Sequence, residues 1–150
     1  MHKALVAARL KNADSCYDSL MALMADDIYY TSLMADHYTH GGWGVFCTDT
    51  TIGTIGIIDE MLLYSNDGVI EALPALPEEW NEGKIEGLRA RTTAEVDIEW
   101  NEESVTLTVT SDKEQSIEIS VYGGEKQTVA FSSGETKIVS LKKESGYFEI

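Results

Sequence analysis

Residues 51–64 read as a helix with apolar side chains on nearly every side. The apolar positions fall on all faces of a helical projection: Ile52, Ile55, Ile57, Ile58, Met61, Leu62 and Leu63. A helix that is apolar all round is buried on all sides. Gly53 and Gly56 would also let another backbone approach it closely. We therefore expect this helix to pack against more structure than a few short neighbours supply.

Two further helices are predicted before this one. Residues 2–10 are rich in strong helix formers, and the pair Lys11-Asn12 ends that run. Asp14 is suited to cap the second helix. One stripe of the second helix carries four residues at helical spacing: Cys16, Leu20, Leu23 and Met24. The stretch 25–50 is then a long loop, and compact domains carry such loops mainly for a functional reason.

The rest of the chain alternates with a period of two. Apolar residues alternate with Glu, Asp, Thr and Ser in three segments: 94–100, 105–110 and 117–121. This pattern is typical of antiparallel strands with one face on a core and one face in water. Turn-forming residues follow at short intervals, as in a β-sandwich. We predict an α+β protein with a helical segment at 1–67, an extended connector at 68–82 and an antiparallel β-sandwich at 83–150.

Composition limits the partners that this chain can have. The net charge is −15 and the sequence pI is about 4.4. Nucleic acids and anionic membranes repel a chain of this charge, so we expect neither as a partner. The apolar runs are all shorter than the roughly 20 residues that span a bilayer. The first residues do not resemble a signal peptide, and the localisation stays open. Cys16 and Cys47 are too few for a disulfide framework or a four-cysteine zinc site.

The long loop holds most of the residues that could do chemistry. Asp49 lies next to the apolar helix, where it is either an N-cap or a carboxylate for sugar hydrolysis, which needs an acid–base pair around the scissile bond. Trp43 could stack against a sugar ring. Asp36, His37 and His40 are weakly spaced metal ligands without a further strong one, so we expect no metal and no cofactor.

Four stretches of the chain follow known motifs in order. Residues 49–65 (DTTIGTIGIIDEMLLYS) are similar to IDGNFGATAGIAEMLLQS. Residues 68–80 (GVIEALPALPEEW) resemble GxIxLLPALPxAW, and residues 83–100 resemble GSVxGLRARGGFEVDxEW. Residues 2–10 resemble the helix WKINLWARL. These motifs belong to glycoside hydrolase family 95, the inverting α-L-fucosidases, which the chain therefore resembles over about residues 2–100.

The resemblance implies a fold and a role for several residues. In that family an (α/α)6 barrel of twelve helices carries the site, so the chain would hold the last barrel helices and a C-terminal β-domain. Asp49 would activate the attacking water, while His40, Trp43 and Thr51 would line the sugar pocket. The general acid and the asparagines that assist the base lie further upstream in the family. Thr50-Thr51 replaces the family's Gly-Asn, which leaves the sugar open between L-fucose and L-galactose.

These observations lead to one main functional expectation. The chain is expected to be the C-terminal part of an inverting glycoside hydrolase acting on oligosaccharides with α-L-fucosides or related α-L-galactosides. Alone it should be inactive because it lacks the general acid. Its partners would be the missing barrel helices of the parent chain or a separate subunit. One alternative is a non-catalytic β-sandwich module that binds carbohydrate or a partner, and another is a degenerate fragment kept as an assembly piece.

Overall fold

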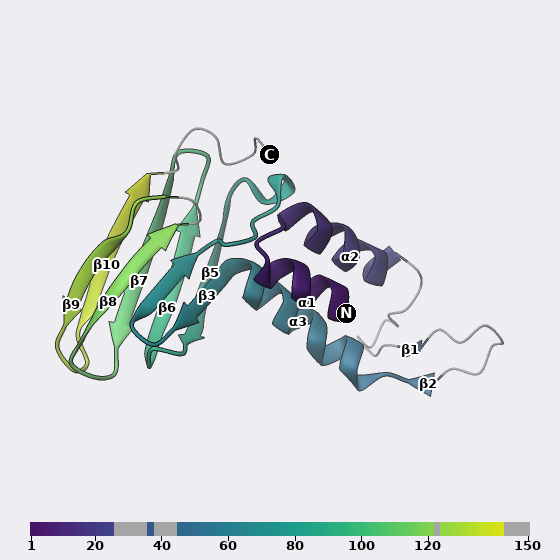
Figure 1. The fold of residues 1–150 in the computed structure, drawn as a ribbon, viewed down its shortest axis with the longest axis horizontal. Helices are drawn as coiled ribbons and strands as arrows, with labels where there is room; N and C mark the ends of the chain where they lie inside the picture. The colour runs from purple at the N-terminus through teal and green to yellow at the C-terminus, as the bar shows by residue number, and fades with distance from the viewer. Residues whose placement is uncertain (26–35, 38–44, 122–123, 143–150) are drawn as a thin grey trace. The chain divides into compact units, whose positions relative to one another are not determined.

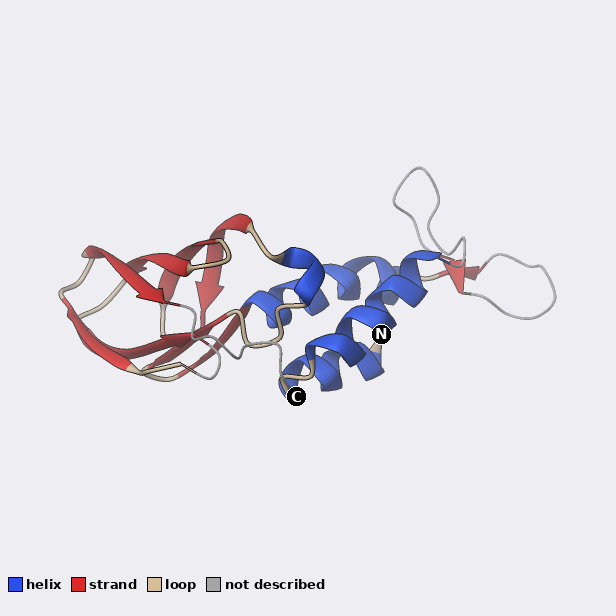
Figure 2. Cartoon of the chain, turned by 90° about the horizontal axis from the view of Figure 1, so that it is seen from above, coloured by secondary structure: helices blue, strands red, loops and turns tan. Residues whose placement is uncertain are grey.

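The computed structural model describes residues 1–25, 36–37, 45–121 and 124–142 (Figure 1). The chain divides into two compact units, Met1–Met61 and Leu62–Ile150. The first unit contains the helices and the second contains two four-stranded sheets (Figure 2). This arrangement confirms the predicted α+β fold with a C-terminal β-sandwich. The boundary between the units follows Met61, whereas we expected the helical segment to continue to residue 67.

The first two helices of the N-terminal unit pack through small and sulfur-containing residues. Helix α1 spans His2–Arg9 and helix α2 spans Ala13–Ala25. The buried side of α1 consists of alanines. The Cys16 thiol of α2 donates a hydrogen bond of 3.3 Å to the Ala4 carbonyl oxygen. Small side chains allow two helix backbones to approach closely, which explains why an alanine-rich first helix pairs with α2.

The expected N-cap of α2 was wrong. The Ser15 backbone N–H donates to the Asn12 side-chain oxygen at 2.9 Å, so Asn12 caps the helix and Asp14 lies in its first turn. Cys16 and Leu20 are buried as expected, but Met24 is 44% exposed. Of the residues on this stripe, only Cys16 and Leu20 are therefore buried.

Helix α3 spans Thr48–Leu62, so it begins earlier and ends earlier than the predicted 51–64. Residues 63 and 64, assigned to the helix from their apolar character, begin strand β3 (Leu63–Asn66) instead. This strand pairs antiparallel with β4 (Val69–Ala72) across a tight turn at Gly68, where φ is +68°. Glycine suits this position because it adopts a positive φ without the steric penalty of a side chain.

The second unit contains six further strands in sequence. They are β5 (Gly83–Ala90), β6 (Ala94–Trp100), β7 (Ser104–Ser111), β8 (Gln115–Val121), β9 (Gln127–Phe131) and β10 (Thr136–Lys142). One sheet has the order β10-β7-β6-β5 and the other β3-β4-β8-β9. The pairs are antiparallel except that β4 runs parallel to β8. A strand therefore lies in the segment expected to be only an extended connector.

The period-two pattern accounts for the sandwich core. Along β6 and β7 the apolar residues are buried and the residues between them face outward, as the sequence predicts. Trp100 ends β6, and its indole N–H donates to the Trp80 carbonyl oxygen at 2.8 Å. Gly83 lies so close to the Trp100 ring that an added Cβ would be 2.4 Å from it. The short 3₁₀ turn Glu78–Trp80 is tied to the sandwich by this contact.

Candidate functional site

Asp49 is the second residue of α3, and its side chain is exposed. It therefore does not occupy the N-cap position, and that interpretation of Asp49 was wrong. The first turn is held by its neighbours instead. The Thr51 hydroxyl donates to the Cys47 carbonyl oxygen at 3.3 Å, and the Cys47 sulfur lies 3.2 Å from the Thr50 hydroxyl. A carboxylate in the first turn is also stabilised by the positive end of the helix dipole.

The residues predicted to share the site with Asp49 are only partly described. Thr51 is half-buried and lies on the same helix. Thr51 follows Asp49 by two residues. Because each residue of a helix turns by about 100°, the two side chains point in directions roughly 200° apart around the helix axis. The structure therefore does not bring these two side chains together. His40 and Trp43 lie outside the described residues.

The backbone just before α3 forms a short antiparallel pair that the sequence analysis missed. Strand β1 (Asp36–His37) pairs with β2 (Val45–Phe46), with Asp36 opposite Phe46 and His37 opposite Val45. Two-residue strands carry no periodic signal, which explains the omission. The pair places the backbone of residues 36–37 beside the segment that leads into Asp49.

One face of α3 is buried and the opposite face is uncovered. Thr54, Ile57 and Met61 are at most 5% exposed. Ile52 and Ile55, on the other side, are 70% and 63% exposed. Asp49 stands three residues before Ile52 and so lies along the edge of this uncovered face. The apolar-all-round helix is thus only half enclosed by the chain that the structure describes.

The two glycines of α3 have different surroundings. A Cβ at Gly53 would collide with the Met1 side chain, so what lies against this glycine is a flexible side chain and not the neighbouring backbone that we expected. A Cβ at Gly56 would meet nothing within 4 Å. Gly56 faces the uncovered side, where it leaves room for further structure. We name this side, made of Ile52, Ile55 and Gly56, the outer face of α3.

Two acidic groups near the end of α3 have distinct environments. Glu60 forms an ion pair with Arg9 of α1, which fastens the two helices. Partial burial, with a smaller contribution from the Glu60 carboxylate, raises the pKa of Asp59. Cys16 has no catalytic features, since burial raises the pKa of its thiol and it is fully enclosed.

Neither a metal cluster nor a membrane span is found among the residues that the structure describes. Within those residues no three His, Cys, Asp or Glu side chains gather in a way that could hold a metal ion. The helices of the described part are also too short or too polar to cross a bilayer. The chemistry that the described site offers is therefore that of one exposed carboxylate beside an apolar face.

Comparison with known proteins gives two findings. Residues 64–150 match glycoside hydrolase family 95, C-terminal domain. The chain is also 32% identical over 107 residues to "Alpha-L-fucosidase 2" of Arabidopsis thaliana. That alignment covers 67% of this chain and 12% of the plant protein. The chain thus spans a small part of the length of this relative.

Proposed function

The chain belongs to glycoside hydrolase family 95, and on that premise we propose that it is the C-terminal part of an inverting α-L-fucosidase-like enzyme. In this proposal Asp49 is the base that activates the attacking water. The observation that carries the proposal is the exposed Asp49 carboxylate at the start of α3, beside a helix face that the described chain leaves uncovered. A base needs an open carboxylate, and the neighbouring helix turn holds the backbone of Asp49 in place.

The reaction requires two carboxyl groups. In an inverting hydrolysis the base accepts a proton from water while the water oxygen bonds to the anomeric carbon. The glycosidic C–O bond breaks, and a general acid gives its proton to the leaving oxygen. The two groups stand about 6.5–9.5 Å apart so that the water fits between sugar and base. Asp49 supplies the first group, and the acid would come from the upstream part of the parent enzyme. The isolated chain is therefore expected to be inactive.

The missing structure would also cover the outer face of α3. Ile52 and Ile55 are the most exposed apolar side chains of this helix. Burying one such side chain is worth about 1.5–3 kcal/mol, so leaving both in water is costly for the helical unit. We propose that upstream helices of the parent chain, or of a separate subunit, pack here and bring the general acid toward Asp49.

The proposed substrates are α-L-fucosides or related α-L-galactosides. The relative's name supports the first sugar. The second stays in the proposal because Thr50 and Thr51 stand where the family motif has Gly-Asn. The two sugars differ only by a hydroxyl group on C6, which a single pocket side chain can accept or reject.

Replacing Asp49 tests this function in the parent enzyme that carries the chain. Asp49→Asn keeps the size of the side chain and removes its ability to accept a proton. We expect the hydrolysis of an aryl α-L-fucoside to fall roughly 10²- to 10⁴-fold, the usual contribution of a general base. Asp14→Asn is the matched control, since Asp14 is also an exposed acid in the first turn of a helix. Equal activity of the two variants would contradict the proposal.

One observation favours a second function. The family match begins at residue 64 and so covers the β-sandwich but not Asp49. A β-sandwich that binds carbohydrate without catalysis is compatible with that match. Retained hydrolysis in Asp49→Asn, together with glycan binding by the isolated chain, would favour this second function over the first.

A further inference from the structure

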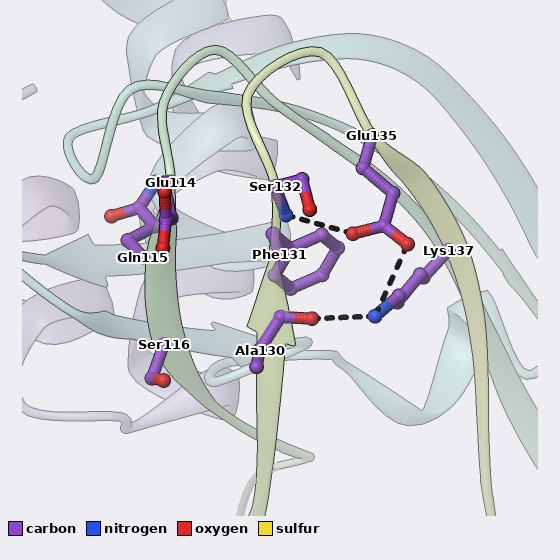
Figure 3. Close-up of a pocket in the computed structure, with 8 residues that line it drawn as sticks. All are labelled: Glu114, Gln115, Ser116, Ala130, Phe131, Ser132, Glu135 and Lys137. Atoms are coloured by element: carbon purple, nitrogen blue, oxygen red, sulfur yellow. Dashed lines mark hydrogen bonds and ion pairs between the residues drawn. The ribbon is translucent and has the colours of Figure 1, made fainter.

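The β-sandwich contains an open hollow between the start of β8, the end of β9 and the start of β10 (Figure 3). Its volume is about 620 Å³. Eight residues line it: Glu114, Gln115, Ser116, Ala130, Phe131, Ser132, Glu135 and Lys137. All of them belong to the second unit. The hollow is therefore a property of the sandwich alone.

A buried polar network fixes the β8 side of the hollow. The Gln115 amide N–H₂ donates to the Thr92 carbonyl oxygen at 2.7 Å and to the Ser111 hydroxyl at 2.8 Å. The Gln115 carbonyl oxygen accepts from the Thr92 hydroxyl at 2.8 Å. Thr92 and Ser111 are fully buried, so this network cannot rearrange without leaving polar groups unpaired. The wall next to it is preformed.

The β10 side presents an acid and a cation that are held in place. The Glu135 carboxylate accepts from the Ser132 backbone N–H at 2.7 Å, and its other oxygen lies 3.3 Å from the Lys137 ammonium. Lys137 also donates to the Ala130 carbonyl oxygen at 2.6 Å. Both side chains remain more than a third exposed. Each therefore keeps hydrogen-bonding capacity toward the hollow.

The Phe131 ring lies between the β8 residues and the Glu135–Lys137 pair, as Figure 3 shows. The Lys137 ammonium is 5.5 Å from the centre of the ring. Phe131 is 3% exposed, so it fixes the base of the hollow as part of the core and does not act as an open stacking surface. Contacts to a ligand would consequently be mainly polar.

The charges of the lining disfavour an anionic ligand. Glu114 and Glu135 repel anions, in a chain whose net charge is −15. The Lys137 ammonium is paired with Glu135, so it adds hydrogen-bond donors without making the lining positive. What remains are donors and acceptors side by side, namely a carboxylate, an ammonium and the hydroxyls of Ser116 and Ser132. A ligand with many neutral hydroxyl groups satisfies such a set, because each hydroxyl can both donate and accept.

We propose that this hollow binds a neutral saccharide, with Glu135 accepting from and Lys137 donating to its hydroxyls. The proposal takes its substrate class, a carbohydrate, from the proposed function. It adds a glycan site in the sandwich, built from residues that the hydrolysis does not use. Through such a site the β-domain would hold one part of an oligosaccharide.

The test is an NMR titration of the full chain with L-fucose and L-galactose, with glycerol as a small polyol without a ring. We expect saturable shifts in the backbone amides of residues 131–137, with a Kd on the order of 1 mM. Lys137→Met should raise this Kd roughly tenfold by removing a charge-assisted hydrogen bond. Lys126→Met is the matched control, since Lys126 makes a comparable exposed ion pair with Glu118 at 2.7 Å. Its Kd should equal that of the unchanged chain.

A second variant covers the case in which Lys137→Met does not fold. Glu135→Gln retains an oxygen for the Ser132 N–H, so the turn should persist while the carboxylate is lost. The absence of saturable shifts, equal shifts with glycerol, or equal Kd values for Lys137→Met and Lys126→Met would each overturn the proposal. If no sugar binds while Asp49→Asn still abolishes hydrolysis by the parent enzyme, the saccharide-binding proposal is wrong and the proposed catalytic function is retained. If the hollow binds sugar while Asp49→Asn stays active, the proposed catalytic role fails instead.

Discussion

The helical unit and the sandwich differ in how completely they bury their apolar side chains. In the residues that the structure describes, large exposed apolar side chains are concentrated in the helical unit: Val6, Leu10, Met21, Met24, Ile52 and Ile55. The sandwich contributes one, Ile138, while its central strands bury theirs completely. The sandwich therefore has a core of its own. The helical unit instead presents apolar surface among its described residues.

The difference follows from how the two kinds of element use their sequence. A strand with alternating residues has a single apolar face, and the facing sheet covers that face. A helix that is apolar all round needs neighbours on every side. Met1 and Arg9 of α1 contact α3, and these contacts involve only part of its surface. Within the described residues, the outer face of α3 is consequently left exposed.

The largest expected effect comes from emptying the sandwich core. Ile98 is fully buried in β6, so Ile98→Ala should lower the free energy of unfolding by about 2–5 kcal/mol. The free energy of unfolding is measured by urea titration with Trp fluorescence as the signal, since Trp100 reports on the core. The control Ile138→Ala removes the same atoms from a side chain that is 71% exposed and should change stability by less than about 0.5 kcal/mol. Similar losses for both variants would refute the claim that the sandwich has an independent core.

The next effect concerns the outer face of α3. We expect the isolated chain to dimerise or to bind an apolar dye through exposed Ile52 and Ile55. The double change Ile52→Gln and Ile55→Gln should remove most of that binding, since each buried isoleucine contributes about 1.5–3 kcal/mol to an association. Ile138→Gln, on the sandwich, should have little influence. Sedimentation and dye fluorescence measure both. A strictly monomeric, dye-silent chain would show that the helices need no further cover.

The smallest expected effects on stability come from replacing one glycine in each unit by alanine. Gly83→Ala places a Cβ against the Trp100 ring and should destabilise the sandwich by about 1–3 kcal/mol. Gly56→Ala meets open space within α3 and should stabilise the isolated chain by about 0.5–1 kcal/mol, because alanine favours a helix. In the parent enzyme the same alanine should reduce activity if another helix packs on the outer face. Thermal unfolding and fucoside hydrolysis report the two results, and a destabilised isolated Gly56→Ala would mean that this side of α3 is already covered.

Much of the fold could be predicted from local patterns. The alternation in 94–100 coincides with β6 because side-chain period is a property of consecutive residues. The motif around residue 49 led to Asp49 as the candidate base, and Asp49 is exposed in the first turn of α3. Its alternative as an N-cap was wrong because the helix begins one residue before it. Caps depend on one or two dihedral angles, which composition does not encode.

Other features had no local signal. Leu63 and Tyr64 continue the apolar run of α3, yet they pair with β4 through backbone hydrogen bonds. The hollow was also missed, because Gln115 and Lys137 lie on strands separated in the sequence. Both features arise from contacts between distant segments.

The sequence by itself determined which segments are helical, which alternate as strands, and which family the chain resembles. These are properties of neighbouring side chains and of short motifs. Only the tertiary structure decided where α3 ends, that β4 runs parallel to β8, and which face of α3 remains in water. The physical reason is that strand pairing and burial depend on hydrogen bonds and contacts between residues far apart in the chain, which leave no periodic trace in the sequence.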